Sequence, residues 1–403
     1  MGPFEFASAK KIVNQINGMS DIAKHCASLG IKRPCVITDP GILASGLLEP
    51  IESTLLSATE SSSTCTKSNN GIAAVAVFSD VQADPSEKVI EQALLCALSH
   101  HADGIIGFGG GSAMDCAKVV SVLASDKAEQ SNIELASCYG IEQIHCERLP
   151  LICIPTTAGT GSEVTPIAVI TTGETTKAGI VSSKLIPDIA LLDAQLTLSL
   201  PAHVTAATGI DAMVHAIEAY TSIHKKNMYS DMLARQALSL LSQNIETATF
   251  DGQNILARQN MLLGACLAGQ AFANAPVAAV HALAYPLGGH FHIPHGLSNA
   301  LVLPHVLKFN HDSAYKQYAQ LAPFVVNDLS PQQNAQDSSH ALIEYAESLT
   351  QRLNLPTKLR DLNIARKDLP LLADDAMLQT RLLTNNPKTV KRSDALAIYE
   401  AAF

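Results

Sequence analysis

The stretch Gly104–Lys118, GIIGFGGGSAMDCAK, decides the fold of the first half of the chain. An apolar run with strand character leads into the glycines Gly109–Gly111 and then into a segment with helical character. Glycines let a phosphate approach the backbone, and a helix amino terminus offers free N–H groups with partial positive charge. Ser112 stands where the dinucleotide fingerprint G-x-G-x-x-G has its last glycine. Two interpretations are open: a pyrophosphate-binding turn, or a tight strand-to-helix turn that binds nothing.

Other short runs rich in apolar and β-branched residues alternate with helical stretches on both sides of this segment. They lie at residues 34–38, 72–78, 149–154 and 189–193. Such alternation predicts βαβ units and a mostly parallel sheet. Asp84 and Pro85 have the residue types of a helix N-cap and first turn, so we expect a helix to follow them up to about residue 101.

The character of the sequence changes near residue 200. Long segments rich in Ala, Leu and Met follow, such as 206–220 and 231–248, and β-branched runs become rare. The prediction is an α/β domain over 1–200 with a mostly parallel, nucleotide-binding sheet, followed by an all-α domain over 201–403.

Composition narrows the classes of partner. The chain has 403 residues and a net charge of −10, which argues against nucleic-acid backbones and anionic membranes as partners. Charged residues make up 16% of the chain, against about 25% in typical proteins, and apolar residues make up 47%. Much surface must therefore be hidden in cores or subunit contacts, and we expect small-molecule ligands and a homodimer or larger homo-oligomer.

Cysteine usage and the start of the chain predict a cytoplasmic protein. The nine cysteines are odd in number and form no C-x-x-C pair, as expected for reduced thiols. The first residues lack the basic-then-apolar layout of a secretion signal, and Phe6 stands where a myristoylation signal needs Ser or Thr.

A second polar, glycine-rich segment, 155–166 (PTTAGTGSEVTP), follows the strand at 149–154. Hydroxyls and glycines at the carboxyl end of a strand suit a loop that hydrogen-bonds a nucleotide, although an ordinary solvated loop has the same composition. Asp39 follows the strand at 34–38, where a carboxylate can bind a ribose and repel a 2′-phosphate. Because an Asp at a strand end is common, this feature alone indicates little.

The sharpest constellation lies in the second half. Asp211 and His215 are four residues apart and share one face of a predicted helix, where such a pair can chelate an ion or form a surface hydrogen bond. From Gln259 to Leu307 the chain carries no Asp, Glu, Lys or Arg, and we expect buried helices around a site rather than a membrane span, because prolines and histidines interrupt this stretch. Its closely spaced histidines are His281, His290, His292 and His295.

Unpaired buried imidazoles are costly, so these histidines predict a metal or a substrate. Three histidines and one carboxylate would suit Zn²⁺ or Fe²⁺ with an open coordination position. Spacing does not decide which histidines bind. His290 and His292 point to opposite faces if the chain is extended there, so at least one of them is not a ligand.

Taken in order, the motifs resemble the iron-containing, or group III, alcohol dehydrogenase family over nearly the whole chain. The segments that carry the likeness are 109–115 (GGGSAMD), 155–166, 184–193 (KLIPDIALLD), 200–220 and 268–306. The resemblance implies a dehydroquinate synthase-like fold, with an α/β domain for NAD(P), a helical domain for the metal, and the site in the cleft between them. It also implies the metal ligands Asp211, His215, His281 and His295, and leaves His290 and His292 as non-ligands.

For the cofactor, the resemblance implies that pyrophosphate binds at Gly110, Gly111 and Ser112. The residues implied to line the adenine and nicotinamide parts are Thr156, Thr157, Thr160, Ser162 and Val164. Lys177 would reach a ribose hydroxyl. One departure concerns Tyr285, because many members have a histidine there that relays protons. Tyr285 could relay a proton or only pack beside the cofactor.

The resulting expectation is an NAD-dependent, metal-dependent alcohol dehydrogenase or aldehyde reductase for a small aliphatic alcohol or diol. The expected ion is Fe²⁺, with Zn²⁺ as the alternative, and NADP is the less favoured cofactor. The metal would act as a Lewis acid while the sheet domain positions the hydride donor. The alternatives are a glycerol dehydrogenase or dehydroquinate synthase-like enzyme of the same superfamily, and a metal-binding regulatory protein without turnover.

Overall fold

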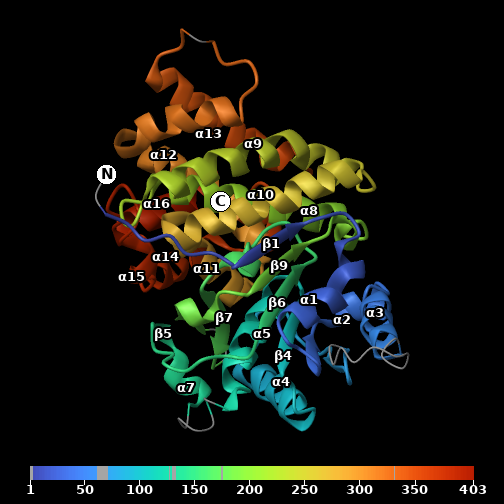
Figure 1. The fold of residues 1–403 in the computed structure, drawn as a ribbon. Helices are drawn as coiled ribbons and strands as arrows, with labels where there is room; N and C mark the ends of the chain where they lie inside the picture. Colours follow the sequence, from blue (N-terminus) through green and yellow to red (C-terminus); the bar gives the residue numbers. More distant parts are fainter. Residues whose placement is uncertain (1–2, 61–70, 127, 129–132, 174–175, 331) are drawn as a thin grey trace. The chain divides into compact units, whose positions relative to one another are not determined.

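The computed structural model describes residues 3–60, 71–126, 128, 133–173, 176–330 and 332–403 (Figure 1). The chain forms two compact units. The α/β unit comprises Ser8–Thr157 and Ser162–Ser199, and the helical unit comprises the chain up to Ala7, Ala158–Gly161 and Leu200–Phe403. The short segment 158–161 therefore packs with the helices, although it follows a strand of the α/β unit.

A six-stranded sheet forms the centre of the α/β unit, and all of its neighbouring strands are parallel. In spatial order the strands are β1 (Lys11–Asn14), β9 (Ile189–Leu192), β6 (Leu151–Pro155), β4 (Gly104–Gly109), β2 (Pro34–Ile37) and β3 (Ala76–Phe78). This confirms the mostly parallel sheet and a strand in each of the five predicted runs. The edge strand β1 was not predicted, because four residues with polar ends give no apolar run.

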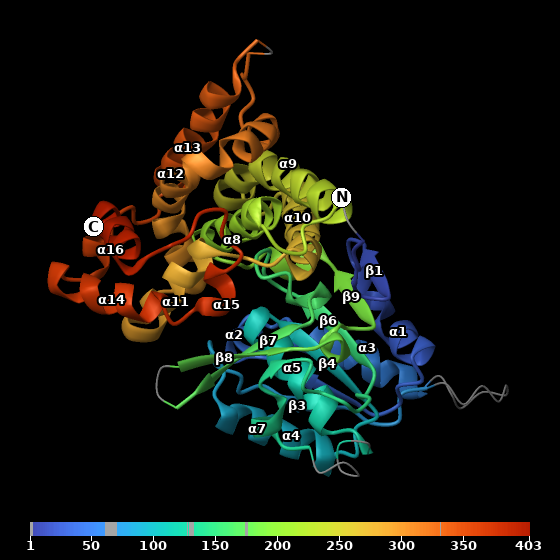
Figure 2. The ribbon, with the colours of Figure 1, turned by 90° about the vertical axis from the view of Figure 1, so that its left-hand side faces the viewer.

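Helices cover both faces of this sheet. The longer ones are α1 (Ile22–Ser28), α3 (Leu48–Glu60), α4 (Glu87–Ser99) and α5 (Gly111–Leu123), and the short ones are α2 (Pro40–Ala44) and α7 (Leu135–Cys138). Successive side chains of a strand point to opposite faces of the sheet, so they pack in two different hydrophobic cores. Ile105 packs with α4 and α5, and Ile106 packs with α1 and α3. Helix α5 lies along β4 and β6, and this places its first turn where β4 ends (Figure 2).

The helix expected after Asp84 is present as α4, but its start differs from the prediction. Ser86 is the N-cap residue, and Asp84 lies before the helix with φ 55°. Asp tolerates this left-handed conformation better than most residues. Asp84 is therefore part of a turn, and its side chain is available for contacts outside the helix.

A second, three-stranded sheet was not predicted. Its spatial order is β5 (Gly140–Ile141), β8 (Thr176–Val181) and β7 (Ile167–Thr172). Strands β7 and β8 pair antiparallel, with Ile167 opposite Val181, and Gly173 takes φ 63° between them. An alternation of strands and helices does not indicate such a hairpin, because no helix separates its two strands. Strand β7 packs against α4 and α5.

The helical unit confirms the mostly helical second half. Its helices are α8 (Ala202–Thr221), α9 (Met228–Phe250), α10 (Ile255–Asn274), α11 (Ala279–Phe291), α12 (His295–Leu321), α13 (Ala335–Arg352), α14 (Leu369–Ala376), α15 (Thr380–Leu383) and α16 (Arg392–Ala402). Helix α8 packs against α9, α10 and α12 (Figure 1). It is buried over most of its length. Polar side chains on α8 are therefore held away from water.

The charge-free stretch 259–307 lies in α10, α11 and the first half of α12, and most of it is buried. Within the described residues, no single helix has the length and hydropathy needed to cross a membrane. Helices α10 and α11 meet that criterion only when they are taken as a pair, and the pair is bent by 107°.

Candidate functional site

One buried face of α8 carries three ionisable side chains. Asp211, His215 and Glu218 follow at spacings of four and three residues and are 2%, 4% and 4% exposed. Residues at these spacings lie above one another on a helix. The packing of α8 against its neighbours explains why this face is closed to water.

The structure brings the four predicted metal ligands together inside the helical unit. Asp211 Oδ1 lies 4.0 Å from His215 Nε2, 3.8 Å from His281 Nε2 and 3.6 Å from His295 Nε2. His281 is in the first turn of α11, and His295 is the first residue of α12. The ligand atoms of Asp211, His281 and His295 all lie within 4.8 Å of one another. Three helices thus direct one carboxylate and three imidazoles to one point.

Burial and neighbouring charges shift the pKa values of His215 and Asp211. Burial lowers the pKa of His215 to about 3, although the Asp211 carboxylate opposes this shift. Burial alone would raise the pKa of Asp211, but His215, His295 and His281 hold it below its ordinary value. At neutral pH the His215 ring is uncharged and Asp211 is ionised, which is the state in which both bind cations. The His215 ring stacks on Phe272 and on His281, with centroids 4.3 Å and 4.7 Å away.

The residues present fit a divalent ion. Asn299 donates from Nδ2 to Asp211 Oδ1 at 2.5 Å, and the same amide lies 3.3 Å from Nε2 of both His281 and His295. Asn299 Oδ1 is buried without a hydrogen-bond partner. Three nitrogen donors and one oxygen donor suit Fe²⁺ or Zn²⁺, and a cation would offset the crowding of their lone pairs. Asp211, His215 and His281 are buried, whereas the His295 side chain is 33% exposed.

Two residues that contact the candidate ligands were not predicted from the sequence. Glu218 accepts a hydrogen bond from His281 Nδ1 at 2.6 Å, and Asn299 touches three of the ligands. Glu218 is an acidic residue within the largely apolar run 212–220. This position was a signal that Glu218 has a specific role, because a buried carboxylate needs a partner. Asn299 gave no comparable signal.

The remaining histidines lie apart from the cluster. His290 Nε2 is 2.5 Å from Asp375 Oδ2 on α14, and His292 ends α11 with φ 53°. Tyr285 is one turn after His281 on α11, and its ring centroid lies 5.8 Å from that of His295. Tyr285 is thus beside the ligand set without being a member of it.

In the α/β unit, the glycine turn ends β4 and starts α5. Gly109 has φ 149°, and a Cβ there would lie 2.8 Å from Asp39 Oδ2 and 2.9 Å from Ala113 Cβ, so only glycine fits. Gly110 is the N-cap of α5 and has no side chain to cap the helix. Gly110 therefore does not cap the first-turn N–H groups at Gly111 and Ser112. An anion site at a helix start requires such uncapped N–H groups.

Asp39 has a structural role that was not predicted. Its Oδ1 accepts hydrogen bonds from the N–H groups of Gly41 at 2.9 Å and Ile42 at 3.1 Å, and this caps α2. Its Oδ2 faces Gly109. The carboxylate therefore stands beside the glycine turn at the carboxyl ends of β2 and β4.

The predicted residues of the 155–166 segment divide between the two units. Thr156 donates its N–H to the Gly109 carbonyl at 3.0 Å, and the Thr157 side chain lies 3.7 Å from where a Cβ of Gly110 would be. Thr160 belongs to the segment 158–161 of the helical unit. That segment packs closely, since a Cβ on Gly161, at φ 62°, would lie 2.5 Å from the Cα of Gly269.

The other predicted cofactor residues of the α/β unit already have protein partners. Ser162 donates to Asp115 Oδ1 at 2.6 Å, and Val164 is fully buried. Lys177 forms an ion pair of 2.7 Å with Asp84, whose N–H donates to Ser112 Oγ at 3.2 Å. Asp84 therefore connects two residues that were predicted to bind different parts of the cofactor.

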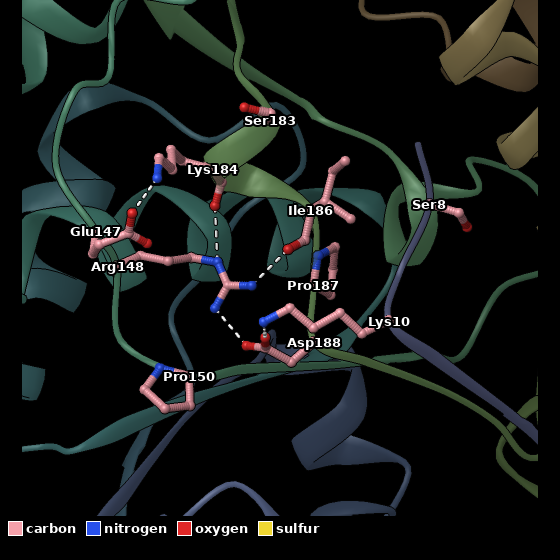
Figure 3. Close-up of a pocket in the computed structure, with 10 residues that line it drawn as sticks. All are labelled: Ser8, Lys10, Glu147, Arg148, Pro150, Ser183, Lys184, Ile186, Pro187 and Asp188. Atoms are coloured by element: carbon pink, nitrogen blue, oxygen red, sulfur yellow. Dashed lines mark hydrogen bonds and ion pairs between the residues drawn. The ribbon is translucent and has the colours of Figure 1, made fainter. Parts of the chain in front are cut away.

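A pocket of about 450 Å³ lies elsewhere in the α/β unit (Figure 3). Arg148 crosses it and donates to Asp188 Oδ2 at 2.6 Å and to the carbonyls of Lys184 and Ile186, while Lys10 pairs with the other Asp188 oxygen. The pocket adjoins the amino ends of β1, β6 and β9, whereas open α/β sheets bind ligands at the carboxyl ends. We assign it to the packing of the sheet.

Comparison with known proteins extends over the whole chain. Residues 9–194 match the family model for iron-containing alcohol dehydrogenase, and residues 205–403 match the C-terminal model of the same family. Long-chain-alcohol dehydrogenase 1 of Geobacillus thermodenitrificans is 40% identical over 375 residues, which are 93% of this chain and 90% of that protein.

Solved structures of related proteins also superimpose on this chain over nearly its full length. A 1,3-propanediol oxidoreductase superimposes with a TM-score of 0.91 at 32% identity and covers 100% of both chains. Sulfoacetaldehyde reductase of Bifidobacterium kashiwanohense, solved in complex with NAD⁺, gives a TM-score of 0.84 at 25% identity and covers 100% of this chain and 99% of its own. The chain belongs to the iron-containing alcohol dehydrogenase family and is an oxidoreductase that acts on CH–OH groups.

Proposed function

We propose that this protein is an NAD-dependent, metal-dependent alcohol dehydrogenase or aldehyde reductase. The observation that carries the proposal is the convergence of Asp211, His215, His281 and His295, of which His295 is partly exposed. These four side chains would hold Fe²⁺, or Zn²⁺ as the alternative. The ion supplies a Lewis acid for the alcohol or carbonyl oxygen.

The α/β unit supplies the features that bind a dinucleotide. The amides at the start of α5, from Gly110 to Ser112, would hold the pyrophosphate, and Thr156 and Thr157 adjoin this turn. The Asp39 carboxylate beside the turn favours NAD over NADP, because it would repel a 2′-phosphate. The NAD⁺ complex of a related reductase supports this cofactor.

The further residues assigned to the cofactor are Thr160, Ser162, Val164 and Lys177. Tyr285 stands next to His295, where its hydroxyl could pass a proton from the substrate or its ring could pack beside the nicotinamide. In either role the side chain acts next to the ligand set.

A small aliphatic alcohol or diol is the proposed substrate. The relatives are named for long-chain alcohols, 1,3-propanediol and sulfoacetaldehyde, so the family accepts chains of different length and charge. For the whole protein we propose a cytoplasmic homo-oligomer. The odd number of cysteines and the lack of a C-x-x-C pair among them support a cytoplasmic protein. The exposed apolar side chains of Phe4, Met228 and Met232 support a homo-oligomer.

The direct test is absorbance at 340 nm with purified protein that has been stripped of metal and reloaded with Fe²⁺ or Zn²⁺. With NADH and short aldehydes, we expect turnover in a reloaded sample and none in the stripped sample. Metal binding without NADH consumption would favour a regulatory protein. Oxidation of glycerol in strong preference to propanol and propanediols would favour a glycerol dehydrogenase.

A further inference from the structure

The buried Glu218 carboxylate joins two parts of the helical unit. It projects from α8 and accepts hydrogen bonds from three groups at the start of α11. These are the N–H of Ala278 at 2.9 Å, the N–H of Val280 at 2.6 Å and His281 Nδ1 at 2.6 Å. These three contacts hold the carboxylate in position.

The contact with His281 selects one tautomer of the ring. An ionised carboxylate only accepts hydrogen bonds, so Nδ1 must carry the proton. In the neutral ring the lone pair then resides on Nε2, which lies 3.8 Å from Asp211 Oδ1. Glu218 therefore directs the metal-binding nitrogen of His281 into the ligand cluster.

The two backbone contacts fix where α11 begins. The N-cap residue of this helix is Ala278, which has no polar side chain to cap it. Glu218 supplies the missing acceptor from another helix, and its negative charge suits a helix amino terminus. The same carboxylate thus sets the start of α11 and the direction of the imidazole in its first turn.

We infer that Glu218 is a positioning residue that raises the metal affinity of the site through His281. The inference rests on the proposed function, because that function places an ion on His281. Carboxylates that orient metal-binding histidines typically contribute about 10–100-fold to metal affinity.

The test is the affinity of metal-free protein for Zn²⁺, measured by competition with a chromophoric chelator. Glu218→Gln keeps the shape of the side chain but loses the charge and places an amide among three N–H donors. We expect the Zn²⁺ affinity to fall about 10–100-fold. The matched control is Asn227→Ala, because the buried Asn227 caps α9 in the same unit through Tyr229 and Ser230. This control should lose stability and keep its Zn²⁺ affinity.

A second variant covers the case in which Glu218→Gln does not fold. Glu218→Asp keeps the charge and withdraws the carboxylate by one methylene, so we again expect a loss of at least about tenfold. A folded variant of either kind that binds Zn²⁺ within twofold of the unmodified protein would overturn the inference. If the unmodified protein itself binds no Zn²⁺ or Fe²⁺, the proposed function fails, and the inference fails with it.

Discussion

The two units hold their candidate site residues in different states. In the helical unit, the predicted ligands of α8, α11 and α12 face one another, and each imidazole Nε2 lies within 4.0 Å of one Asp211 oxygen. In the α/β unit, several predicted cofactor residues bind other protein groups, as Asp39 does with α2 and Lys177 does with Asp84. The candidate metal ligands of the helical unit therefore already converge in the structure. A cofactor bound at the candidate residues of the α/β unit would have to compete with contacts inside the protein.

The largest expected effect is on the candidate metal ligands. His295→Ala removes one of the four proposed ligands, and we expect turnover to fall by more than about a hundredfold, since even residues that only orient ligands contribute about 10–100-fold to metal affinity. Elemental analysis of the purified variant should show that the divalent ion is lost. The matched control is His290→Ala, because His290 pairs with Asp375 outside the cluster. One tightly held ion per chain in His295→Ala would contradict the ligand assignment.

A smaller effect is expected next to the ligands. If Tyr285 relays a proton, Tyr285→Phe should lower kcat for alcohol oxidation at least about tenfold, at the lower edge of general acid–base effects. Metal content and cofactor affinity should not change. Tyr285→His should add an inflection in the rate near neutral pH, because the imidazole has a reference pKa of about 6.5 and the phenol about 10. Unchanged kcat in the Phe variant, where a solvent isotope effect shows rate-limiting proton transfer, would assign Tyr285 to packing.

The nucleotide site allows a test of charge without loss of structure. Asp39→Asn keeps a good helix cap for α2 and removes the negative charge, whereas Asp39→Gly removes both. We expect the ratio of kcat/KM for NADH over NADPH to fall about tenfold in both variants, which corresponds to about 1.4 kcal/mol. A change only in the Gly variant would mean that the cap matters rather than the charge. Equal kcat/KM for both cofactors in the unmodified enzyme would refute the role of Asp39.

The smallest effect concerns the ion pair of Lys177, one of the residues that we propose to bind the cofactor. Asp84→Asn removes the negative charge 2.7 Å from Lys177, whose side chain is 11% exposed against 53% for Asp84. Surface ion pairs contribute about 0.2–1 kcal/mol. The KM for NADH should therefore fall by up to about fivefold at constant kcat. Asp374→Asn is the control, because it breaks the pair with Arg392 in the helical unit and should leave KM unchanged. A higher KM in Asp84→Asn would show that Asp84 orients Lys177 for the cofactor.

The sequence predicted those features that a single short pattern encodes. Apolar runs gave five strands of the parallel sheet, and the spacing of Asp211 and His215 placed both on one helix face. The hairpin of β7 and β8 was missed because its strands have no helix between them. Which histidines converge depends on how α11 and α12 pack, and the residue spacing holds no information on that.

The supporting residues were not predicted, for a related reason. Glu218 lies on the same helix face as Asp211 and His215, but its partners are on α11, and Asn299 contacts Asp211 and His281 on other helices as well as His295 on its own. Asp39 was predicted from its place after a strand, and its hydrogen bonds to Gly41 and Ile42 were missed although they are local and Pro40 follows it as in a helix start. The partners of Glu218, in contrast, are 60 to 63 residues away in the chain and become visible only in the fold.

If the proposed ligands on α8, α11 and α12 bind an ion, metal supply is linked to the amount of folded protein. An ion that binds the native site and not the unfolded chain shifts the folding equilibrium, by about 2.7 kcal/mol when free metal is at 100 times its Kd. A cell short of iron or zinc would then hold more of this chain in the unfolded form, which proteases remove. Metal scarcity would in this way lower the abundance of the enzyme as well as the fraction that carries an ion.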